Sequence, residues 1–365
     1  TLAPAVTAAQ RTQIINMVRR AARAEIMPRF RRLSDGDIRS KSRADDLVTD
    51  ADTKAEAMIT RALQIAFPSA LVIGEEAVEA KPELLEGIKD AQLAFHIDPV
   101  DGTWNFAHGL PVFGVIVAAT RYGKPVFGLI YDPVGDDWVI ADEQMTPQIQ
   151  RPFGAPRDLR AASGKPLEEM SGILPLHLFP KDKQAQLAAT FPDFARINTL
   201  RCSAHEYRML AQGNFDFSLT ALLHPWDHAA GALIAARAGM HVKMLDGGDY
   251  SAARTSGHLL IAPDKATCSS RADGSSMLIL NSQPSPCGSS LITSGARASG
   301  VFTSTTSPSS GARISTASSS ASITTTGSSA EITSPSSGNS TKVTSPSSEM
   351  PKGVNPTVTS SSPSS

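Results

Sequence analysis

Short apolar runs, each bounded by glycine or proline turns, fill the middle of the chain and most constrain what it can fold into. Five of these runs are expected to be strands, at 71–73, 93–97, 112–119, 126–131 and 138–141. Runs this short and this apolar are typical of buried strands, which need helices or a second sheet to cover them.

Amphipathic helices are predicted before these strands. Thr7 is expected to cap a first helix in which Ile14, Ile15 and Val18 recur at helical spacing. A second helix is predicted from about Asp52 to Phe67, because Pro68 cannot continue it.

Strand and helix patterns also alternate after residue 190. The pattern predicts strands at 197–200, 215–219, 241–245 and 258–261, with helices at 204–211 and 226–238. Mixed strands with helices on their faces indicate a layered α/β architecture.

The composition changes abruptly near residue 266. Residues 267–365 contain 47 Ser and Thr in 99 positions and only eight charged residues. Such a segment has too little apolar surface to offset the entropy lost on ordering, so we expect it to be a disordered, low-complexity tail. The expected catalytic domain is 1–266, built from two α/β halves of about 1–145 and 146–266.

The charge balance argues against a nucleic-acid partner. The Ser/Thr-rich segment holds five of the 34 Lys and Arg and three of the 35 Asp and Glu, which leaves 29 and 32 for residues 1–266. A mildly acidic domain argues against a nucleic-acid partner, because nucleic-acid binding usually needs a basic face. The sequence contains no segment of 18 consecutive apolar residues, so no membrane-spanning helix is expected.

Cysteine usage and the N-terminus favour a cytoplasmic protein. Of Cys202, Cys268 and Cys287, only Cys202 falls in the foldable part, and the spacing matches neither a disulfide framework nor a zinc site. The first residues lack the charged-then-apolar pattern of a secretory signal.

Acidic residues gather at four places, each of them a strand end, a loop or a helix start. Loops at strand ends are where α/β sheets place their ligands. The four clusters are at 48–52, 74–76, 98–103 and 225–227.

The third cluster carries the strongest signal. Asp98 follows an apolar strand, Pro99 turns the chain, and Asp98 and Asp101 can converge with the Val100 carbonyl between them. Two carboxylates and a carbonyl are hard oxygen ligands, which suit Mg²⁺ or Mn²⁺ better than zinc. Gly102, followed by a threonine, leaves room for an anion beside the metal, the arrangement that phosphate-ester hydrolysis needs.

Each acidic cluster also has a purely structural interpretation. Asp-Pro and Asp-Gly are common turn formers, although a turn needs neither the second carboxylate nor the Gly-Thr pair. Asp227 could cap a helix, Asp50 and Asp52 could cap the second helix, and Glu75 could belong to a surface pair.

Taken together, these motifs resemble the inositol monophosphatase family, a superfamily of Mg²⁺-dependent, lithium-sensitive sugar phosphatases. The resemblance spans roughly residues 8–265. It rests mainly on the runs IDPVDGTWNF at 97–106 and PWDHAAG at 225–231, with LVTDAD at 47–52 and GEE at 74–76 at the remaining acidic positions.

The resemblance implies a fold and a metal site. It implies a five-layer αβαβα sandwich, often assembled as a homodimer, that binds two or three Mg²⁺ ions. The first ion is expected at Glu75, Asp98 and the Val100 carbonyl, and the second at Asp98, Asp101 and Asp227, with a third near Glu75.

The resemblance also implies catalytic and phosphate-binding roles. Asp52 and Thr103 match the pair that positions and activates the attacking water, beside the catalytic ligand Glu75. The Gly102 and Thr103 amides match the phosphate cradle, to which Asp101 and Asp227 are adjacent. Metal ions would neutralise the dianionic phosphate and lower the pKa of the attacking water.

The substrate is expected to be a small phosphorylated metabolite resembling inositol 1-phosphate. Arg201 could contact an anionic or polyhydroxylated substrate, or form a structural salt bridge. Thr220 stands where inositol-selective members have Glu, so histidinol phosphate, fructose 1,6-bisphosphate and 3′(2′),5′-bisphosphate nucleotides are alternatives. A non-catalytic regulator that binds a phosphometabolite is the alternative of another class.

Overall fold

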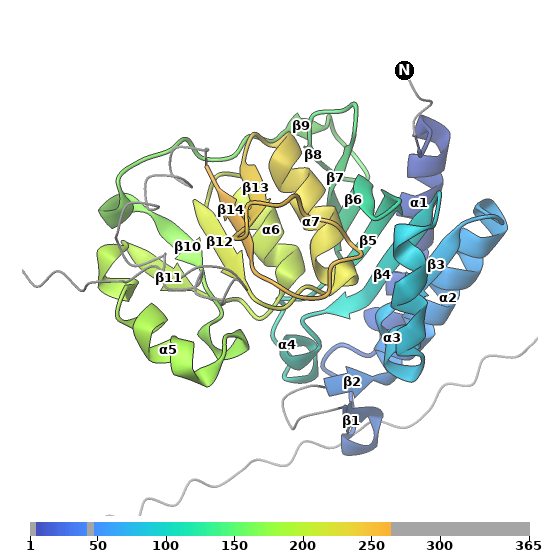
Figure 1. Cartoon of the computed structure of the whole chain (residues 1–365). Coiled ribbons are helices and arrows are strands. Elements are labelled where there is room, and N and C mark those ends of the chain that lie inside the picture. The colour runs from blue at the N-terminus through green and yellow to red at the C-terminus, as the bar shows by residue number, and fades with distance from the viewer. Residues whose placement is uncertain (1–4, 42–46, 264–365) are drawn as a thin grey trace, which may run out of the picture. The chain divides into compact units, whose positions relative to one another are not determined.

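A computed structural model of the chain describes residues 5–41 and 47–263. The Ser/Thr-rich segment at 267–365 lies outside the described residues, so its expected disorder stays a prediction. Within the described part the fold is layered α/β, as predicted, with two sheets and helices on their faces (Figure 1).

The larger sheet has seven strands, which pair in chain order. The first pair is parallel and every later pair is antiparallel. The strands are β3 (Leu71–Gly74), β4 (Ala94–Asp101), β5 (Gly114–Arg121), β6 (Lys124–Asp132), β7 (Asp137–Asp142), β8 (Gln148–Gln150) and β9 (Arg157–Asp158).

The smaller sheet has five strands: β10 (Ser171–Ile173), β11 (Arg196–Asn198), β12 (Phe217–Thr220), β13 (His241–Met244) and β14 (Leu259–Ala262). They pair in the order β11-β10-β12-β14-β13, with β10 parallel to both of its neighbours. A separate hairpin pairs β1 (Ile38–Ser40) with β2 (Leu47–Thr49).

Seven α-helices accompany these sheets in the described residues: α1 (Ala8–Ala21), α2 (Asp50–Ala66), α3 (Glu75–Ala80), α4 (Thr103–Ala107), α5 (Lys181–Ala188), α6 (Ser203–Ala211) and α7 (Pro225–Arg237). Helices α1 and α2 cover one face of the larger sheet, and α6 and α7 lie between the two sheets (Figure 1). Helix α5 packs on the far side of the smaller sheet, which completes the five-layer αβαβα sandwich.

Strand β5 shows why the larger sheet needs helices on both faces. Its residues alternate between the two faces, so Val115 and Val117 join the core beneath α1 and α2, while Ile116 and Ala118 join the core around α6 and α7. A strand that is apolar on both faces is stable only when both faces are covered.

The predicted helix starts are confirmed, with one shift. Thr7 caps α1 through a capping box with Gln10. Helix α2 begins at Asp50 rather than near Asp52, because Thr49 is its cap and Asp52 is the third helical residue. The sequence patterns did not reveal β10, α5 or the π-helical turn at Ala22–Ile26 that extends α1.

Two further predictions concern membrane-spanning helices and the division of the chain into two halves. Among the described residues, no helix is long and apolar enough to cross a membrane. The larger sheet takes in strands up to Asp158, and α7 contacts strands of both sheets. The division into halves near residue 145 stays a prediction.

Candidate active site

A bulge at the end of β4 brings Asp98 and Asp101 together. Asp98 pairs with Ile116 and Asp101 with Gly114, so three residue steps on β4 oppose two on β5. In a regular strand two residues three positions apart point to opposite faces. The extra residue in the bulge changes the direction of one of the two side chains, so that both carboxylates can face the same side of the strand. The strand continues through Pro99 to Asp101, although a turn was expected at the proline.

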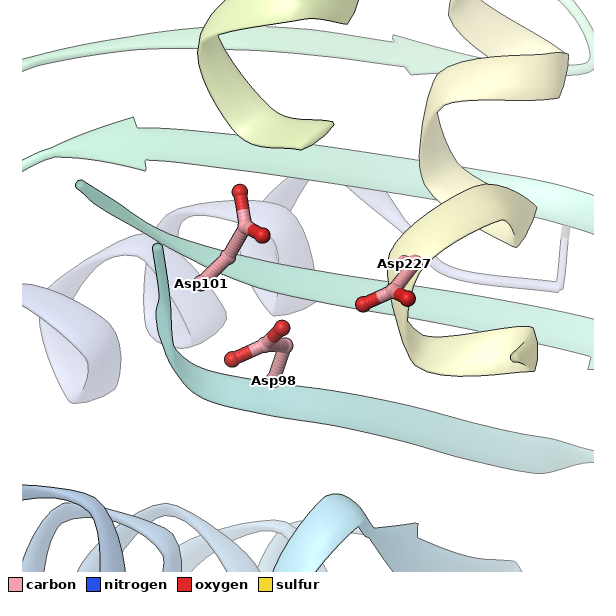
Figure 2. Close-up of side chains that lie close together, drawn as sticks. All are labelled: Asp98, Asp101 and Asp227. Atoms are coloured by element: carbon pink, nitrogen blue, oxygen red, sulfur yellow. The ribbon is translucent and has the colours of Figure 1, made fainter. Parts of the chain in front are cut away.

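Asp227 joins the two strand carboxylates from the first turn of α7. Carboxylate oxygens of Asp98, Asp101 and Asp227 all lie within 4.8 Å of one another (Figure 2). Asp98 and Asp101 are only 2% and 7% exposed. The structure therefore places three predicted ligands around one point, although β4 and α7 are far apart in the sequence.

The clustered carboxylates repel one another in a buried site. Burial and then the charges of Glu75, Asp101 and Asp227 raise the pKa of Asp98 well above its usual value. Burial and Asp227 raise the pKa of Asp101 to about 7. Three clustered carboxylates, two of them buried and with raised pKa values, are a donor set that fits a hard divalent cation.

Asp227 differs from its two neighbours because a histidine faces it. His224 Nδ1 lies 3.5 Å from Asp227 Oδ2. Burial by itself raises the pKa of Asp227, but the hydrogen bond and charge of His224 lower it below its usual value overall. Asp227 is therefore the member of the cluster that ionises first.

Glu75 lies beside the cluster and contacts a lysine that sequence reasoning missed. Burial raises the pKa of Glu75 to about 8, with Lys41 opposing the shift and Asp227 adding to it. Lys41 Nζ donates to Glu75 Oε1 at 2.8 Å and to Glu76 Oε1 at 2.7 Å, and its side chain is only 6% exposed. No local pattern pairs a lysine with acidic residues more than thirty positions away.

Asp52 has a structural role and a site contact at once. Its Oδ2 accepts a hydrogen bond from the Thr49 amide at 2.9 Å, which is part of the capping box of α2, and a further one from the Thr49 hydroxyl at 2.6 Å. Its Oδ1 lies 3.1 Å from Thr103 Oγ1. Asp52 is fully buried, and burial raises its pKa to about 6.

The Thr103 hydroxyl links this carboxylate to the strand bulge. Thr103 Oγ1 also lies 2.9 Å from the Val100 carbonyl oxygen. A hydroxyl carries one proton, so Thr103 donates to one acceptor at a time and can accept from a water molecule. The Val100 carbonyl, an expected metal ligand, keeps a second lone pair.

Gly102 is required by its backbone conformation. It has φ +86° and precedes α4, and a Cβ there would lie 2.8 Å from the Val112 carbonyl oxygen. A side chain at this position would meet backbone that cannot move aside. Glycine therefore lets the chain pass closely from β4 into α4.

Helix α6 holds Asp101 from the opposite side. Asp101 Oδ2 accepts hydrogen bonds from the Ala204 amide and, at 3.0 Å, from Cys202 Sγ. Burial and the neighbouring Asp101 raise the pKa of the Cys202 thiol well above its usual value, so it remains a hydrogen-bond donor. The free cysteine expected from the sequence is thus a buried contact of a site carboxylate.

A second contact fixes α6 against α7. Tyr207 OH and His228 Nδ1 are 2.9 Å apart, and both side chains are buried. A Cβ on Gly231 would lie 2.1 Å from the Tyr207 ring, so glycine makes room for this tyrosine. The helices that carry the contacts of Asp101 and Asp227 are therefore joined within the core.

The two residues expected to determine substrate specificity, Arg201 and Thr220, differ in exposure. Arg201 is exposed, and its guanidinium lies 4.3 Å from the centroid of the Trp104 ring. Thr220 is 5% exposed, and its hydroxyl accepts from the Leu222 amide at 3.4 Å. Thr220 thus serves a local turn, while Arg201 remains accessible.

Comparisons with known proteins agree with this geometry. Residues 8–277 match the model of the inositol monophosphatase family. The Nus factor SuhB of Vibrio cholerae is 34% identical over 215 residues, which cover 57% of this chain and 75% of that protein. The fructose-1,6-bisphosphatase/inositol-1-monophosphatase of Thermotoga maritima is 28% identical over 59% of this chain and 78% of its own length.

Solved structures show the same fold. The inositol monophosphatase structure of Thermotoga maritima superposes with a TM-score of 0.60 at 24% identity, covering 71% of this chain and 94% of that one. The family match takes in more than half of the chain and all of the acidic clusters described above. The chain belongs to the inositol monophosphatase family.

Proposed function

We propose that this phosphatase is a Mg²⁺-dependent phosphomonoesterase that hydrolyses a small phosphorylated metabolite resembling inositol 1-phosphate, by water attack on phosphorus. The observation that carries the proposal is the cluster of Asp98, Asp101 and Asp227, whose oxygens lie within 4.8 Å of one another and of which the first two are buried. Carboxylates that lie this close repel each other, which favours a cation between them.

The family is metal-dependent, and the acidic cluster suits its ions. In our proposal Glu75, Asp98 and the Val100 carbonyl hold the first Mg²⁺, Asp98, Asp101 and Asp227 hold the second, and a third ion binds near Glu75. Mn²⁺ is the alternative ion. The ions supply neutralisation of the phosphate dianion and activation of water.

Protein groups then orient water and accept its proton. Thr103 Oγ1 can accept a hydrogen bond from water while its own proton points to Asp52 Oδ1, 3.1 Å away. A pKa of about 6 leaves Asp52 mostly ionised at pH 7 yet basic enough to take up a proton. Gly102 and Thr103 bind the phosphate oxygens where the chain enters α4, and Arg201 contacts the rest of the substrate.

Four substrates are candidates, and the contacts of Thr220 bear on the choice. A buried threonine engaged in a local turn cannot replace a glutamate that reaches a ring hydroxyl. Fructose 1,6-bisphosphate therefore stands beside inositol 1-phosphate, in keeping with the name of the Thermotoga maritima relative. Histidinol phosphate and a 3′(2′),5′-bisphosphate nucleotide complete the set.

A phosphate-release assay of the purified full chain with these four substrates tests the proposal. We expect hydrolysis of at least one of them with Mg²⁺ and none with excess EDTA. A chain that leaves every phosphomonoester intact at saturating Mg²⁺ or Mn²⁺ would contradict it. That result would favour a non-catalytic regulator, in keeping with the relative named Nus factor SuhB.

The remaining proposals concern the whole molecule. We propose a catalytic domain at 1–266, a cytoplasmic homodimer and no nucleic-acid partner. A chain truncated after residue 266 should keep full activity and sediment at twice the monomer mass. Loss of activity on truncation would show that the catalytic unit extends further, and the family match to residue 277 marks how far to extend it.

A further inference from the structure

Helix α3 begins with the acidic pair Glu75 and Glu76, and its own cap residue has no side chain to hold it. The cap is Gly74, which offers no acceptor to the first amides of the helix. The helix has only six residues, so its internal hydrogen bonds stabilise it little. A helix this short depends on contacts from elsewhere in the chain.

Glu56 of α2 supplies the missing acceptors. Its Oε2 accepts a hydrogen bond from the Glu76 amide at 2.8 Å, and its Oε1 accepts one from the Ala77 amide at 3.0 Å. These amides belong to the second and third helical residues, which a cap side chain normally binds. Glu56 is only 7% exposed. A buried carboxylate of α2 thus takes the place of a cap side chain in α3.

Gly74 leaves the space that this carboxylate occupies. A Cβ on Gly74 would lie 2.1 Å from Glu56 Cδ, and its three nearest atoms would all belong to the Glu56 carboxyl group. Gly74 has φ −107°, a backbone conformation that any residue adopts. The glycine is therefore required by its contact with Glu56 and not by the turn.

The helix start that Glu56 holds also determines where Glu75 lies. Strands β3 and β4 are parallel, and Gly74 pairs with Ile97. The next residues are Glu75 after one strand and Asp98 on the other, so the two carboxylates leave the sheet at neighbouring positions. Glu75 directly precedes the amide that Glu56 binds. The direction of its side chain therefore depends on the first turn of α3.

Resting on the proposed metal-dependent function, we propose that Glu56 is a positioning residue, which fixes the first turn of α3, directs Glu75 toward the metal site and thereby sets the affinity for Mg²⁺. Glu56 is not itself a ligand in this proposal, because both of its carboxylate oxygens accept from backbone amides. Residues that orient a metal ligand typically change metal affinity about 10- to 100-fold.

Calorimetric titration of the metal-free full chain with Mg²⁺ tests this proposal. Burial raises the pKa of Glu56 to about 7, so a titration at pH 8.5 keeps the carboxylate ionised. We expect Glu56→Gln, which keeps one acceptor, to weaken Mg²⁺ binding about 10-fold, and Glu56→Ala to weaken it up to about 100-fold. At saturating Mg²⁺ the kcat for phosphate release should change far less. In a Glu75→Gln background, Glu56→Gln should cause little further loss, since it acts through Glu75.

A compensating variant and a matched control separate positioning from general stability. In Glu56→Ala, the added change Gly74→Ser places a cap side chain in the space that the glutamate has left, and it should restore much of the Mg²⁺ affinity. Gly74→Ser alone meets the Glu56 carboxyl group and should weaken binding. Asp216→Ala is the control, because it removes a buried carboxylate that accepts from the Ser171 amide at 2.7 Å in the smaller sheet. It should destabilise the fold and leave Mg²⁺ affinity unchanged.

The outcomes are distinct. Unchanged Mg²⁺ affinity in the Glu56 variants, an equal loss in Asp216→Ala, or a full further loss in the Glu75→Gln background would overturn the role of Glu56 while leaving the phosphatase intact. If Glu56→Ala does not fold, Glu56→Gln decides by itself. A wild-type chain that neither binds Mg²⁺ nor releases phosphate would overturn the proposed function and this inference together.

Discussion

The Thr103 hydroxyl lies 3.1 Å from the Asp52 carboxylate, although 51 residues separate them in the chain. Asp52 is fixed by the cap of α2 and Thr103 by the first turn of α4, so neither needs to move to meet the other. A hydroxyl held between a buried carboxylate and a backbone carbonyl is suited to pass a proton.

Thr103→Val should lower kcat about 100-fold or more, because it removes the hydroxyl that contacts Asp52 Oδ1 while keeping the side-chain shape. Thr103→Ser restores the hydroxyl and should recover most of the rate. Steady-state kinetics at saturating Mg²⁺ measures both. The double variant Asp52→Asn/Thr103→Val should be little worse than either single one, since groups that act as a unit are not additive. Fully additive losses would contradict the relay.

Asp98→Asn should lose several orders of magnitude in turnover and still fold. The change removes one buried charge from a repelling cluster, so without Mg²⁺ its midpoint of thermal unfolding should be no lower than that of the wild type. Mg²⁺ should raise the midpoint of the wild type and leave that of the variant nearly unchanged.

Asp182→Asn is the matched control, because Asp182 is an exposed residue of α5 on the far side of the smaller sheet. It should keep the wild-type turnover and the Mg²⁺-dependent rise in midpoint. Near-normal turnover in Asp98→Asn would remove Asp98 from the metal site.

Gly102→Ala tests the close passage between β4 and α4. The added Cβ would meet the Val112 carbonyl at 2.8 Å and would also be strained at φ +86°. We expect a loss of about 2–3 kcal/mol in unfolding free energy together with reduced turnover. Gly154→Ala has the same kind of φ, +101°, with nothing within 4 Å, so it should cost about 1 kcal/mol and no activity. Equal losses in urea titrations of the two variants would contradict the steric argument.

Many of the helices and strands could be predicted from the sequence, because the spacing of apolar residues depends directly on which side chains are buried. The strands of the larger sheet up to Asp142 have the pattern expected of a doubly covered sheet, and Thr7 and Pro68 mark helix ends. Strand β10 was missed because three residues, Ser-Gly-Ile, carry too short a pattern to detect. Its place in the sheet depends on the parallel neighbours β11 and β12, which are distant in sequence.

The sequence predicts the arrangement of site residues where these residues are close together in the chain. The spacing of Asp98 and Asp101 around Pro99 predicted their convergence, although the bulge that achieves it depends on pairing with β5. The approach of Asp227, the Thr103 contact with Asp52 and the pairing of Lys41 with Glu75 depend on tertiary packing. For these the residues alone offered several roles, and the resemblance to a family suggested which to expect for Asp227, Asp52 and Thr103, though not for Lys41.

In the turn between β6 and β7, Asp136 anchors α1 to the larger sheet and makes the stability of the fold depend on pH in the acid range. Arg19 contacts both of its carboxylate oxygens, at 2.8 and 2.7 Å, and Arg23 and Tyr131 add bonds of 2.9 Å each. The Arg19 hydrogen bonds, with Tyr131 and Arg23 contributing, lower the pKa of Asp136 to about 2 against the opposing effect of burial.

A pKa that is lower in the folded state than in the unfolded chain stabilises the fold at high pH. The contribution of Asp136 should therefore be complete above its ordinary pKa near 3.8, should decrease below that pH, and should be lost as the pH falls through about 2. Asp136→Asn tolerates the positive φ of this position, so it isolates the charge. We expect it to cost about 1 kcal/mol at pH 6, since the group is partly exposed, and only about a third of that at pH 2.5.

Urea unfolding of four proteins at the two pH values measures this effect: the wild type, Asp136→Asn, Arg19→Met and the double variant. Because Arg19 is the largest cause of the shift, Asp136→Asn should cost little once Arg19 is gone, even at pH 6. A cost that stays the same at pH 6 and pH 2.5, or in the presence and absence of Arg19, would mean that Asp136 stabilises the chain through its turn geometry and not through its charge.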